Sequence, residues 1–234
     1  ELRNEFNLAS ANSINIARLI PQAFYYVYAY AQLKKAGKPI VFSVPSGNFG
    51  NLSAGVIAWR MGMPVERFIA ATNVNKVVPE YIETANFTPI NPSISTISNA
   101  MDVGNPSNFP RLKALFGDSY DELKNNLSGF YYTDEATRLC MQDVYARTGY
   151  VMCPHTAIAY LGLKEYLKQT DKEVSGVFHS TAHYAKFLPD VEPTLNKKLE
   201  IPKRLSELLE KEKSATQMAA DYGDFKAWLK EELI

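Results

Sequence analysis

The fold of this chain is decided by one stretch, Pro39-Ile-Val-Phe-Ser-Val-Pro-Ser-Gly-Asn-Phe-Gly-Asn51. Its first part, residues 39–44, is a short and almost wholly apolar run, which is typical of a strand buried on both faces. Residues 45–50 predict a loop and 51–62 a helix, and a second apolar strand is expected at 67–71. The order strand, glycine-containing loop, helix, strand predicts a βαβ unit with two parallel strands.

Before this unit, apolar residues recur at helical spacing from about residue 14 to residue 36. Ser13 is the expected N-cap of this helix, because its hydroxyl can accept from an N–H group of the first turn. Pro21 lies inside the pattern and should kink the helix. Gly37 fits the left-handed position that ends a helix.

After the unit, the pattern predicts short elements. The middle of the chain, residues 73–108, is rich in Asn, Pro, Ser and Thr and predicts loops and short helices. Further helices are expected at 109–116, 120–125, 134–148, 155–168 and 185–195, strands at 129–132 and 176–179, and two short helices beyond Ile201. We therefore predict an α/β fold, an open, mostly parallel twisted sheet flanked by helices over residues 1–200, followed by a charged helical extension at 201–234.

Composition excludes several classes of function. The 234 residues carry 25 basic and 25 acidic side chains, so the basic face of a nucleic-acid-binding protein is not expected. No apolar run reaches the length that spans a bilayer, so no membrane partner is expected. Cys140 and Cys153 match no zinc or redox spacing, so we expect no metal, and two free thiols suit a reducing cytoplasm.

The loop Ser46-Gly-Asn-Phe-Gly-Asn51 carries the clearest chemistry. It follows a buried strand and opens a helix, so consecutive backbone N–H groups and a positive helix end face one place. Its glycines allow close approach, and Ser46, Asn48 and Asn51 add side-chain donors. It is neither a Walker A loop nor a Gly-x-Gly-x-x-Gly loop. These residues alone fit a phosphate or carboxylate site and an ordinary βα turn equally well.

This loop, read from Val44, resembles the phosphate-binding loop of the threonine synthases. These are pyridoxal-phosphate enzymes of fold type II, which is similar to the β subunit of tryptophan synthase. Five other segments resemble segments of the same family and follow in the family's order, from about residue 8 to residue 190. They are Asn12-Ser-Ile-Asn-Ile-Ala-Arg18, Phe68-Ile-Ala-Ala-Thr-Asn-Val-Asn75, Ser98-Asn-Ala-Met-Asp-Val-Gly-Asn-Pro-Ser-Asn108, Cys153-Pro-His-Thr-Ala157 and Ser180-Thr-Ala-His-Tyr-Ala-Lys-Phe187.

The resemblance implies roles for particular residues. The phosphate of pyridoxal 5'-phosphate would be held by Ser46, Gly47, Asn48, Phe49, Gly50 and Asn51. The Thr181 hydroxyl would face the pyridine nitrogen and leave it unprotonated, which limits how much carbanion charge the ring absorbs. Asn12, Ser13 and Asn15 would bind the phosphate or carboxylate of the substrate, although Ser13 could equally be only a helix cap. No role follows for His155, His183 or Lys186, and we expect the first two to be structural and the third to be a surface charge.

Two features depart from the family pattern. Tyr184 stands where the family usually has proline, which alters a turn close to Thr181. No lysine here lies in the Phe-Lys-Asp-like segment whose lysine forms the Schiff base with the cofactor, and Phe225-Lys-Ala227 comes after every other motif. We therefore expect that lysine upstream of Glu1, in an N-terminal remainder of the same chain. An isolated segment without it should be inactive.

The reaction implied for the whole enzyme converts O-phospho-L-homoserine and water to L-threonine and phosphate. A serine or threonine dehydratase of the same fold is an alternative, against which the Asn99-Ala-Met-Asp-Val103 and Thr181-Ala-His183 segments argue. A second alternative is a non-catalytic regulatory domain that binds a phosphate ligand.

Overall fold

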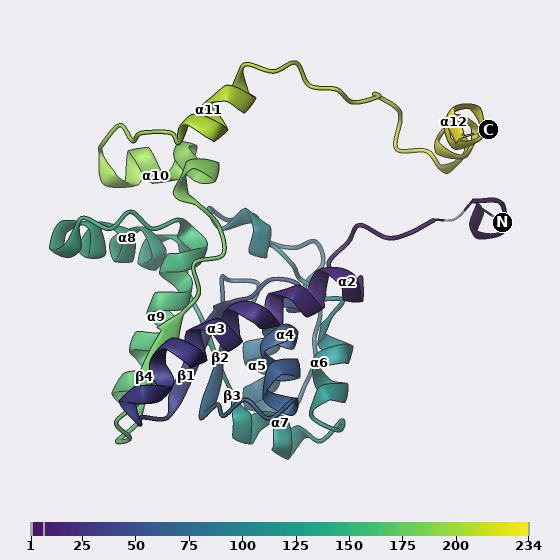
Figure 1. The fold of residues 1–234 in the computed structure, drawn as a ribbon. Helices are drawn as coiled ribbons and strands as arrows, with labels where there is room; N and C mark the ends of the chain where they lie inside the picture. The colour runs from purple at the N-terminus through teal and green to yellow at the C-terminus, as the bar shows by residue number, and fades with distance from the viewer. Residues whose placement is uncertain (1, 7, 234) are drawn as a thin grey trace. The chain divides into compact units, whose positions relative to one another are not determined.

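The computed structural model describes residues 2–6 and 8–233 (Figure 1). The chain divides into two compact units, one of Ala11–Glu200 and one of Glu1–Ser10 with Ile201–Ile234. The first unit contains the whole sheet and all the segments of the predicted site. The lysine expected upstream of Glu1 lies outside the described residues.

Four parallel strands form the sheet of the first unit. They are β1 (Ile40–Pro45), β2 (Arg67–Thr72), β3 (Leu127–Tyr131) and β4 (Ser175–Phe178). Their order is β3-β2-β1-β4, and all three neighbouring pairs are parallel. The predicted α/β class, the parallel open sheet and the βαβ unit are confirmed.

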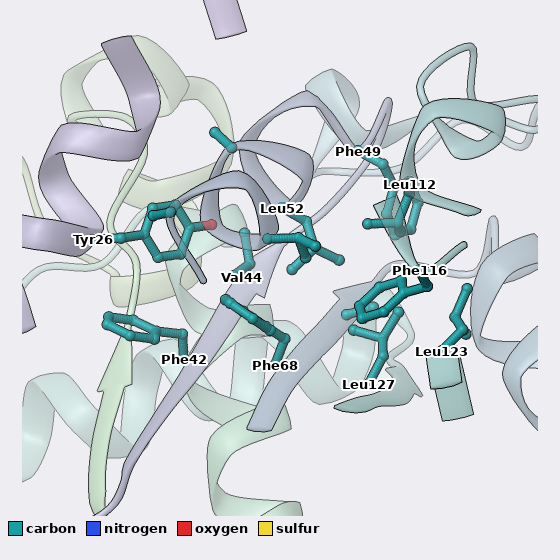
Figure 2. Close-up of a cluster of buried hydrophobic side chains, with 14 of the residues drawn as sticks. Tyr26, Phe42, Val44, Phe49, Leu52, Phe68, Leu112, Phe116, Leu123 and Leu127 are labelled. Atoms are coloured by element: carbon teal, nitrogen blue, oxygen red, sulfur yellow. The ribbon is translucent and has the colours of Figure 1, made fainter. Parts of the chain in front are cut away.

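One face of the sheet packs against the helices that follow and precede β1. These are α3 (Ala23–Leu33) and α4 (Gly50–Arg60). Helix α6 (Phe109–Leu115) packs against α4. Figure 2 shows Phe42 of β1 and Phe68 of β2 in this layer, with the Tyr26 ring above them. The two phenylalanines are 0% and 1% exposed, and burying each such ring contributes about 2 kcal/mol.

Helix α9 (Pro154–Gln169) covers the opposite face, where Leu163 packs against Val41 of β1 and Ile69 of β2. Helix α8 (Asp134–Thr148) packs on α9, and α10 (Leu188–Leu195) packs on α8. Strand β1 is therefore buried on both faces, as its almost unbroken apolar sequence predicted.

The remaining elements of this unit are short. They are α2 (Ile16–Leu19), α5 (Val77–Thr84), α7 (Tyr120–Asn126) and the 3-10 turns η1 (Ile20–Gln22), η2 (Lys34–Ala36), η3 (Asn99–Met101) and η4 (Tyr184–Phe187). The helices and strands expected after residue 38 are present, and most of their ends differ from the predicted ones by one or two residues. The helix predicted at 185–195 begins only at Leu188, because the residues before it form the 3-10 turn η4.

The N-terminal helix differs from its prediction. Instead of one kinked helix over 14–36, the chain forms two α-helices joined by a 3-10 turn at Pro21, because proline lacks the N–H that a continuous helix needs. Gly37 ends the segment with φ +67°, as expected. The prediction that Ser13 caps the first helix is wrong: Asn15 is the cap, and its Oδ1 accepts from the N–H of Ala17 at 2.9 Å.

The second unit contains α1 (Leu2–Glu5), α11 (Lys203–Leu209) and α12 (Tyr222–Leu233). Within it Lys230 pairs with Glu5 at 2.8 Å. Across both units, none of the described helices has the length and apolar character needed to cross a membrane. The described residues also contain no group of three or more His, Cys, Asp or Glu side chains placed to hold a metal ion.

Candidate functional site

A cavity of the first unit lies beyond the carboxyl ends of β1 and β4. The chain runs from β1 through α4 to β2 on one side of β1, while β4 lies on the other side. This is the switch point at which open α/β sheets bind their ligands. The cavity measures about 700 Å³, and its walls include the loop after β1, the segment after β4 and part of α3.

The loop after β1 lines this cavity with Gly47–Asn51. Phe49 has a left-handed conformation, φ 62°, and α4 begins at the next residue. The N–H of Ser46 donates to the Ala71 carbonyl, and that of Ser53 donates to Phe49. Gly47–Asn51 lie between these two residues. Within the part of the chain that the structure describes, none of their five backbone N–H groups donates a hydrogen bond. Such a row at a helix N-terminus is suited to an anion.

The side chains of the loop have another role than expected. We predicted Ser46, Asn48 and Asn51 to add donors for the anion. In the structure the Ser46 hydroxyl donates to the Val44 carbonyl at 3.1 Å, and Asn51 donates to the Pro45 carbonyl at 2.7 Å. Their short polar side chains satisfy nearby carbonyls of the turn, so the free donors are backbone groups.

Asn48 also makes its hydrogen bonds inside the protein. Its Nδ2 donates to the Ser13 hydroxyl at 2.6 Å, and its Oδ1 accepts from the N–H and hydroxyl of Ser107 at 2.5 and 2.9 Å. One amide thereby joins three of the predicted site segments. Its backbone N–H is the group that is left for a ligand.

The two glycines of the loop differ in the space around them. A Cβ at Gly47 would lie 2.7 Å from the Met101 Cα and 2.9 Å from the Ala100 carbonyl oxygen, so only glycine lets the loop pack on η3. A Cβ at Gly50 would meet the Asn108 side chain at 3.4 Å and Ser13 atoms at 3.6 Å or more, which is ordinary contact. Gly50 therefore tolerates a side chain and Gly47 does not.

Thr181 lies on the cavity wall opposite the loop, in the exposed segment after β4. The preceding residue is held by α9, because the Thr156 hydroxyl donates to the Ser180 hydroxyl at 3.1 Å. Thr156 is completely buried, and its hydroxyl also contacts the Cys153 sulfur at 3.2 Å. This chain of contacts fixes the backbone next to Thr181.

The predicted substrate residues are only partly brought to the cavity. Ser13 lies on its wall, whereas the lining includes neither Asn12 nor Asn15. The Ser13 hydroxyl donates to Asn12 Oδ1 at 3.1 Å, in addition to accepting from Asn48. Arg18, which we did not single out, is the one cationic side chain that the described residues place on the lining.

The histidines fall into two classes. His183 is exposed, its Nδ1 accepts from the Ala185 N–H at 3.2 Å and its ring lies 4.2 Å from that of Tyr184. His155 is 3% exposed and lies on the cavity wall, and its ring centroid is 4.6 Å from that of Phe187. Burial lowers its pKa to about 4. Lys186 is exposed, as a surface charge would be.

Sequence reasoning missed two groups on the cavity wall, His179 and Tyr25. His179 directly follows β4, and its N–H continues the ladder to the Ser43 carbonyl at 3.0 Å. Burial lowers the pKa of His179 to about 4 and raises that of Tyr25 to about 12. Both side chains are therefore neutral at pH 7. Because polar residues at the carboxyl ends of parallel strands line such cavities, the position of His179 could have identified it.

The arrangement suits a ligand with one anionic end. The backbone N–H groups of Gly47–Asn51 and the dipole of α4 attract the anion, while His155, His179 and Tyr25 offer neutral polar groups to the rest of the ligand. No metal is needed for such binding. A phosphate ester with an uncharged aromatic part is a ligand of this kind.

Comparisons with known proteins agree on one family. Residues 156–229 match the family model described as "Threonine synthase, C-terminal". The threonine synthase of Serratia marcescens is 42% identical over 230 residues, which cover 98% of this chain and 52% of that protein. The chain spans about half the length of the curated relatives that it matches.

Solved structures give the same result. The crystal structure of threonine synthase from Escherichia coli matches with a TM-score of 0.88 and 40% identity, over 98% of this chain and 53% of that chain. The structure of threonine synthase from Brucella melitensis with PLP bound matches with a TM-score of 0.86 and 27% identity, over 97% of this chain and 53% of that one.

Proposed function

We infer that this chain, which is a homologue of threonine synthases and corresponds to about half of their length, supplies the cofactor-phosphate side of such an enzyme's active site. The whole enzyme converts O-phospho-L-homoserine and water to L-threonine and phosphate with pyridoxal phosphate. The observation that carries this proposal is the row of N–H groups of Gly47–Asn51, residues that line the same cavity as Thr181.

The residues present fit pyridoxal phosphate. Its phosphate matches the Gly47–Asn51 backbone, where five donors lack acceptors in the described chain. The Thr181 hydroxyl, which lines the same cavity, would be a neutral partner for the ring nitrogen and would leave it unprotonated. When bound, pyridoxal phosphate supplies an electron sink for the carbanionic charge of the reacting amino acid. The contribution of this chain is to bind and orient the cofactor.

We assign substrate binding to the segment that contains Asn12, Ser13 and Asn15. Ser13 supports this assignment because it lies on the cavity wall, next to the phosphate loop. Its hydroxyl accepts from Asn48, the residue that links the phosphate loop to two other segments. Arg18 on the same wall adds a positive charge for an anionic substrate.

The lysine that carries the cofactor belongs, in this proposal, to sequence outside the 234 residues. The relatives are about twice as long as the region they share with this chain, and no lysine here has a Phe-Lys-Asp-like setting. The partner of this chain is then the N-terminal remainder of the same protein. We propose that the 234 residues alone bind phosphate ligands weakly and do not turn over substrate.

Binding of pyridoxal phosphate to the complete product of the gene tests the proposal. Gly50→Asp places a carboxylate beside the phosphate site, and Gly50→Asn places a group of the same shape without the charge. Asp also suits the first turn of a helix, so the variant should fold. We expect Gly50→Asp to weaken pyridoxal-phosphate binding about tenfold or more beyond Gly50→Asn, because the introduced carboxylate repels the nearby phosphate group of the ligand.

Equal affinities of the two Gly50 variants and the wild type would mean that the loop is only a turn. Product analysis separates the alternatives. A threonine synthase releases phosphate from O-phospho-L-homoserine, a dehydratase releases ammonia from threonine or serine, and a regulatory domain binds a phosphate ligand without turnover.

A further inference from the structure

His179 is a buried polar residue that the protein itself leaves unpaired. Its side chain is 8% exposed, and neither Nδ1 nor Nε2 has a hydrogen-bond partner among the described residues. A neutral imidazole has one donor and one acceptor nitrogen, and folded proteins normally pair both when they bury them. A buried group without partners calls for a specific explanation.

Packing does not explain the choice of histidine at this position. The ring lies 4.4 Å from that of Tyr26 in an edge-on arrangement, 4.9 Å from that of Tyr25 and 5.6 Å from that of Phe42. These neighbours are aromatic rings. A phenylalanine would also pack among them, and it would not bury two unpaired nitrogens. Histidine at this position therefore gives a less stable protein than phenylalanine would, unless a bound molecule forms hydrogen bonds with its nitrogens.

His179 is also one of the residues that line the cavity. The residue shares the cavity wall with Gly47–Asn51 and with Thr181, which follows it by two positions. Its backbone is fixed by the N–H bond to Ser43 of the neighbouring strand. The imidazole is therefore held rigidly between an aromatic shell and the space where the phosphorylated ligand is expected.

We propose that His179 is a ligand-binding residue whose ring donates a hydrogen bond to the phosphorylated pyridine ligand held between Gly47–Asn51 and Thr181. This inference rests on the proposed function and adds to it a contact on the strand β4 side of the cavity. Burying unpaired nitrogens then lowers the stability of the ligand-free protein, and a bound ligand offsets part of this loss by pairing one of the two nitrogens.

Two variants and a matched control test the role in the complete gene product. His179→Phe keeps the ring and removes both nitrogens, and His179→Gln keeps a donor and an acceptor. His183→Phe is the control, because that histidine is exposed and does not line the cavity. The measurements are the thermal midpoint of the ligand-free protein and the dissociation constants of pyridoxal phosphate and inorganic phosphate.

We expect His179→Phe to keep or raise the ligand-free midpoint while it weakens pyridoxal-phosphate binding about tenfold, the effect of one hydrogen bond in a desolvated site. His179→Gln should recover part of the affinity, and His183→Phe should leave the affinity for pyridoxal phosphate unchanged. The ring-nitrogen NMR signals of His179 should shift when pyridoxal phosphate binds. A smaller loss for inorganic phosphate than for pyridoxal phosphate would assign the contact to the ring end of the ligand, and an equal loss to its phosphate.

The inference is overturned if the wild type binds pyridoxal phosphate and His179→Phe binds it equally well. An unchanged ring-nitrogen signal in the wild type also overturns it, even where a variant fails to fold. If the wild type binds no pyridoxal phosphate at all, the proposed function fails and the inference fails with it. The two failures are thus distinguishable from the wild-type measurement alone.

Discussion

The Asn48 side chain donates a 2.6 Å hydrogen bond to the Ser13 hydroxyl, 35 positions earlier in the chain. The carbonyl oxygen of the same amide accepts from both the N–H and the hydroxyl of Ser107. The amide therefore ties the phosphate loop to the segment before α2 and to the turn before α6. The site is assembled by this bridge, because the three segments share no secondary-structure element.

Removing the bridge should loosen the loop. Asn48→Ala deletes one part-buried hydrogen bond, to Ser13, and two exposed ones, from Ser107, so we expect the free energy of unfolding to fall by about 1–2 kcal/mol. Affinity for pyridoxal phosphate should fall as well, because the backbone N–H groups are no longer held in a row. Urea unfolding and ligand titration of the complete gene product measure both effects.

Asn125→Ala is the control for this prediction, since Asn125 is exposed on α7. A stability of Asn48→Ala equal to that of Asn125→Ala would show that the bridge does not order the loop.

Much of this site could be predicted because its elements are local. An apolar run followed by a Gly- and Asn-containing turn and a helical pattern is enough to predict β1, the loop and α4. The use of Asn48 could not be predicted, because its partners lie 35 and 59 positions away and hydroxyl groups there match many roles. The prediction that Ser13 caps the first helix was wrong for the same reason. A residue that can cap a helix can also accept a hydrogen bond from a distant amide.

The sheet order could also not be read from the pattern. That β4 pairs with β1 depends on the path of more than a hundred residues between them. This pairing places His179, a polar residue at the carboxyl end of an apolar strand, beside the loop. The resemblance to the family supplied Thr181, which local chemistry alone does not distinguish from other threonines.

The Tyr26 hydroxyl forms a hydrogen bond with the end of the phosphate loop where α4 begins. It donates to the Asn51 carbonyl at 2.8 Å, and the Tyr26 side chain is completely buried. Tyr26→Phe should lower the free energy of unfolding by about 1 kcal/mol, the net value of one such bond. Chemical denaturation measures it, with Tyr28→Phe as the control because Tyr28 on the same helix is 68% exposed. Equal stabilities of the two variants would contradict the prediction.

Gly55 of α4 should not tolerate alanine. A Cβ there would lie 2.5 and 2.6 Å from two atoms of the Tyr26 ring and 2.9 Å from the Phe68 ring. Alanine gains about 1 kcal/mol of helix propensity, but overpacking a buried site costs about 1–3 kcal/mol. We expect Gly55→Ala to be destabilised on balance and to shift the Tyr26 ring. A variant more stable than the wild type in thermal unfolding would show that the Tyr26 and Phe68 rings can move aside at little energetic cost.

Acid should destabilise the fold through its buried histidines. Burial lowers the pKa of His155 and of His179 to about 4, while the unfolded chain keeps the ordinary value of 6.5. Near His155, Asp102 opposes this shift and Lys186 adds to it. Below pH 6.5 the unfolded chain therefore binds more protons, so stability is lost as the pH falls toward 4. From pH 7 to pH 5 we expect a loss of about 2 kcal/mol for each histidine.

Denaturation at these two pH values measures the slope. His179→Phe and His155→Gln should each reduce it. An unaltered slope in His179→Phe would mean that its imidazole is protonated as readily in the folded protein as in the unfolded chain.

Thr156 gives a way to separate the two ends of the cavity. Its buried hydroxyl donates to Ser180, the residue before Thr181, and it has no contact with the phosphate loop among the hydrogen bonds of the described residues. Thr156→Val keeps the shape and removes the hydroxyl, so the Thr181 segment should lose its anchor while the loop keeps its own. We expect pyridoxal phosphate to bind several-fold more weakly, inorganic phosphate to bind as before, and Thr156→Ser to behave like the wild type. If both ligands lost affinity equally in Thr156→Val, the two ends of the cavity would not be positioned independently.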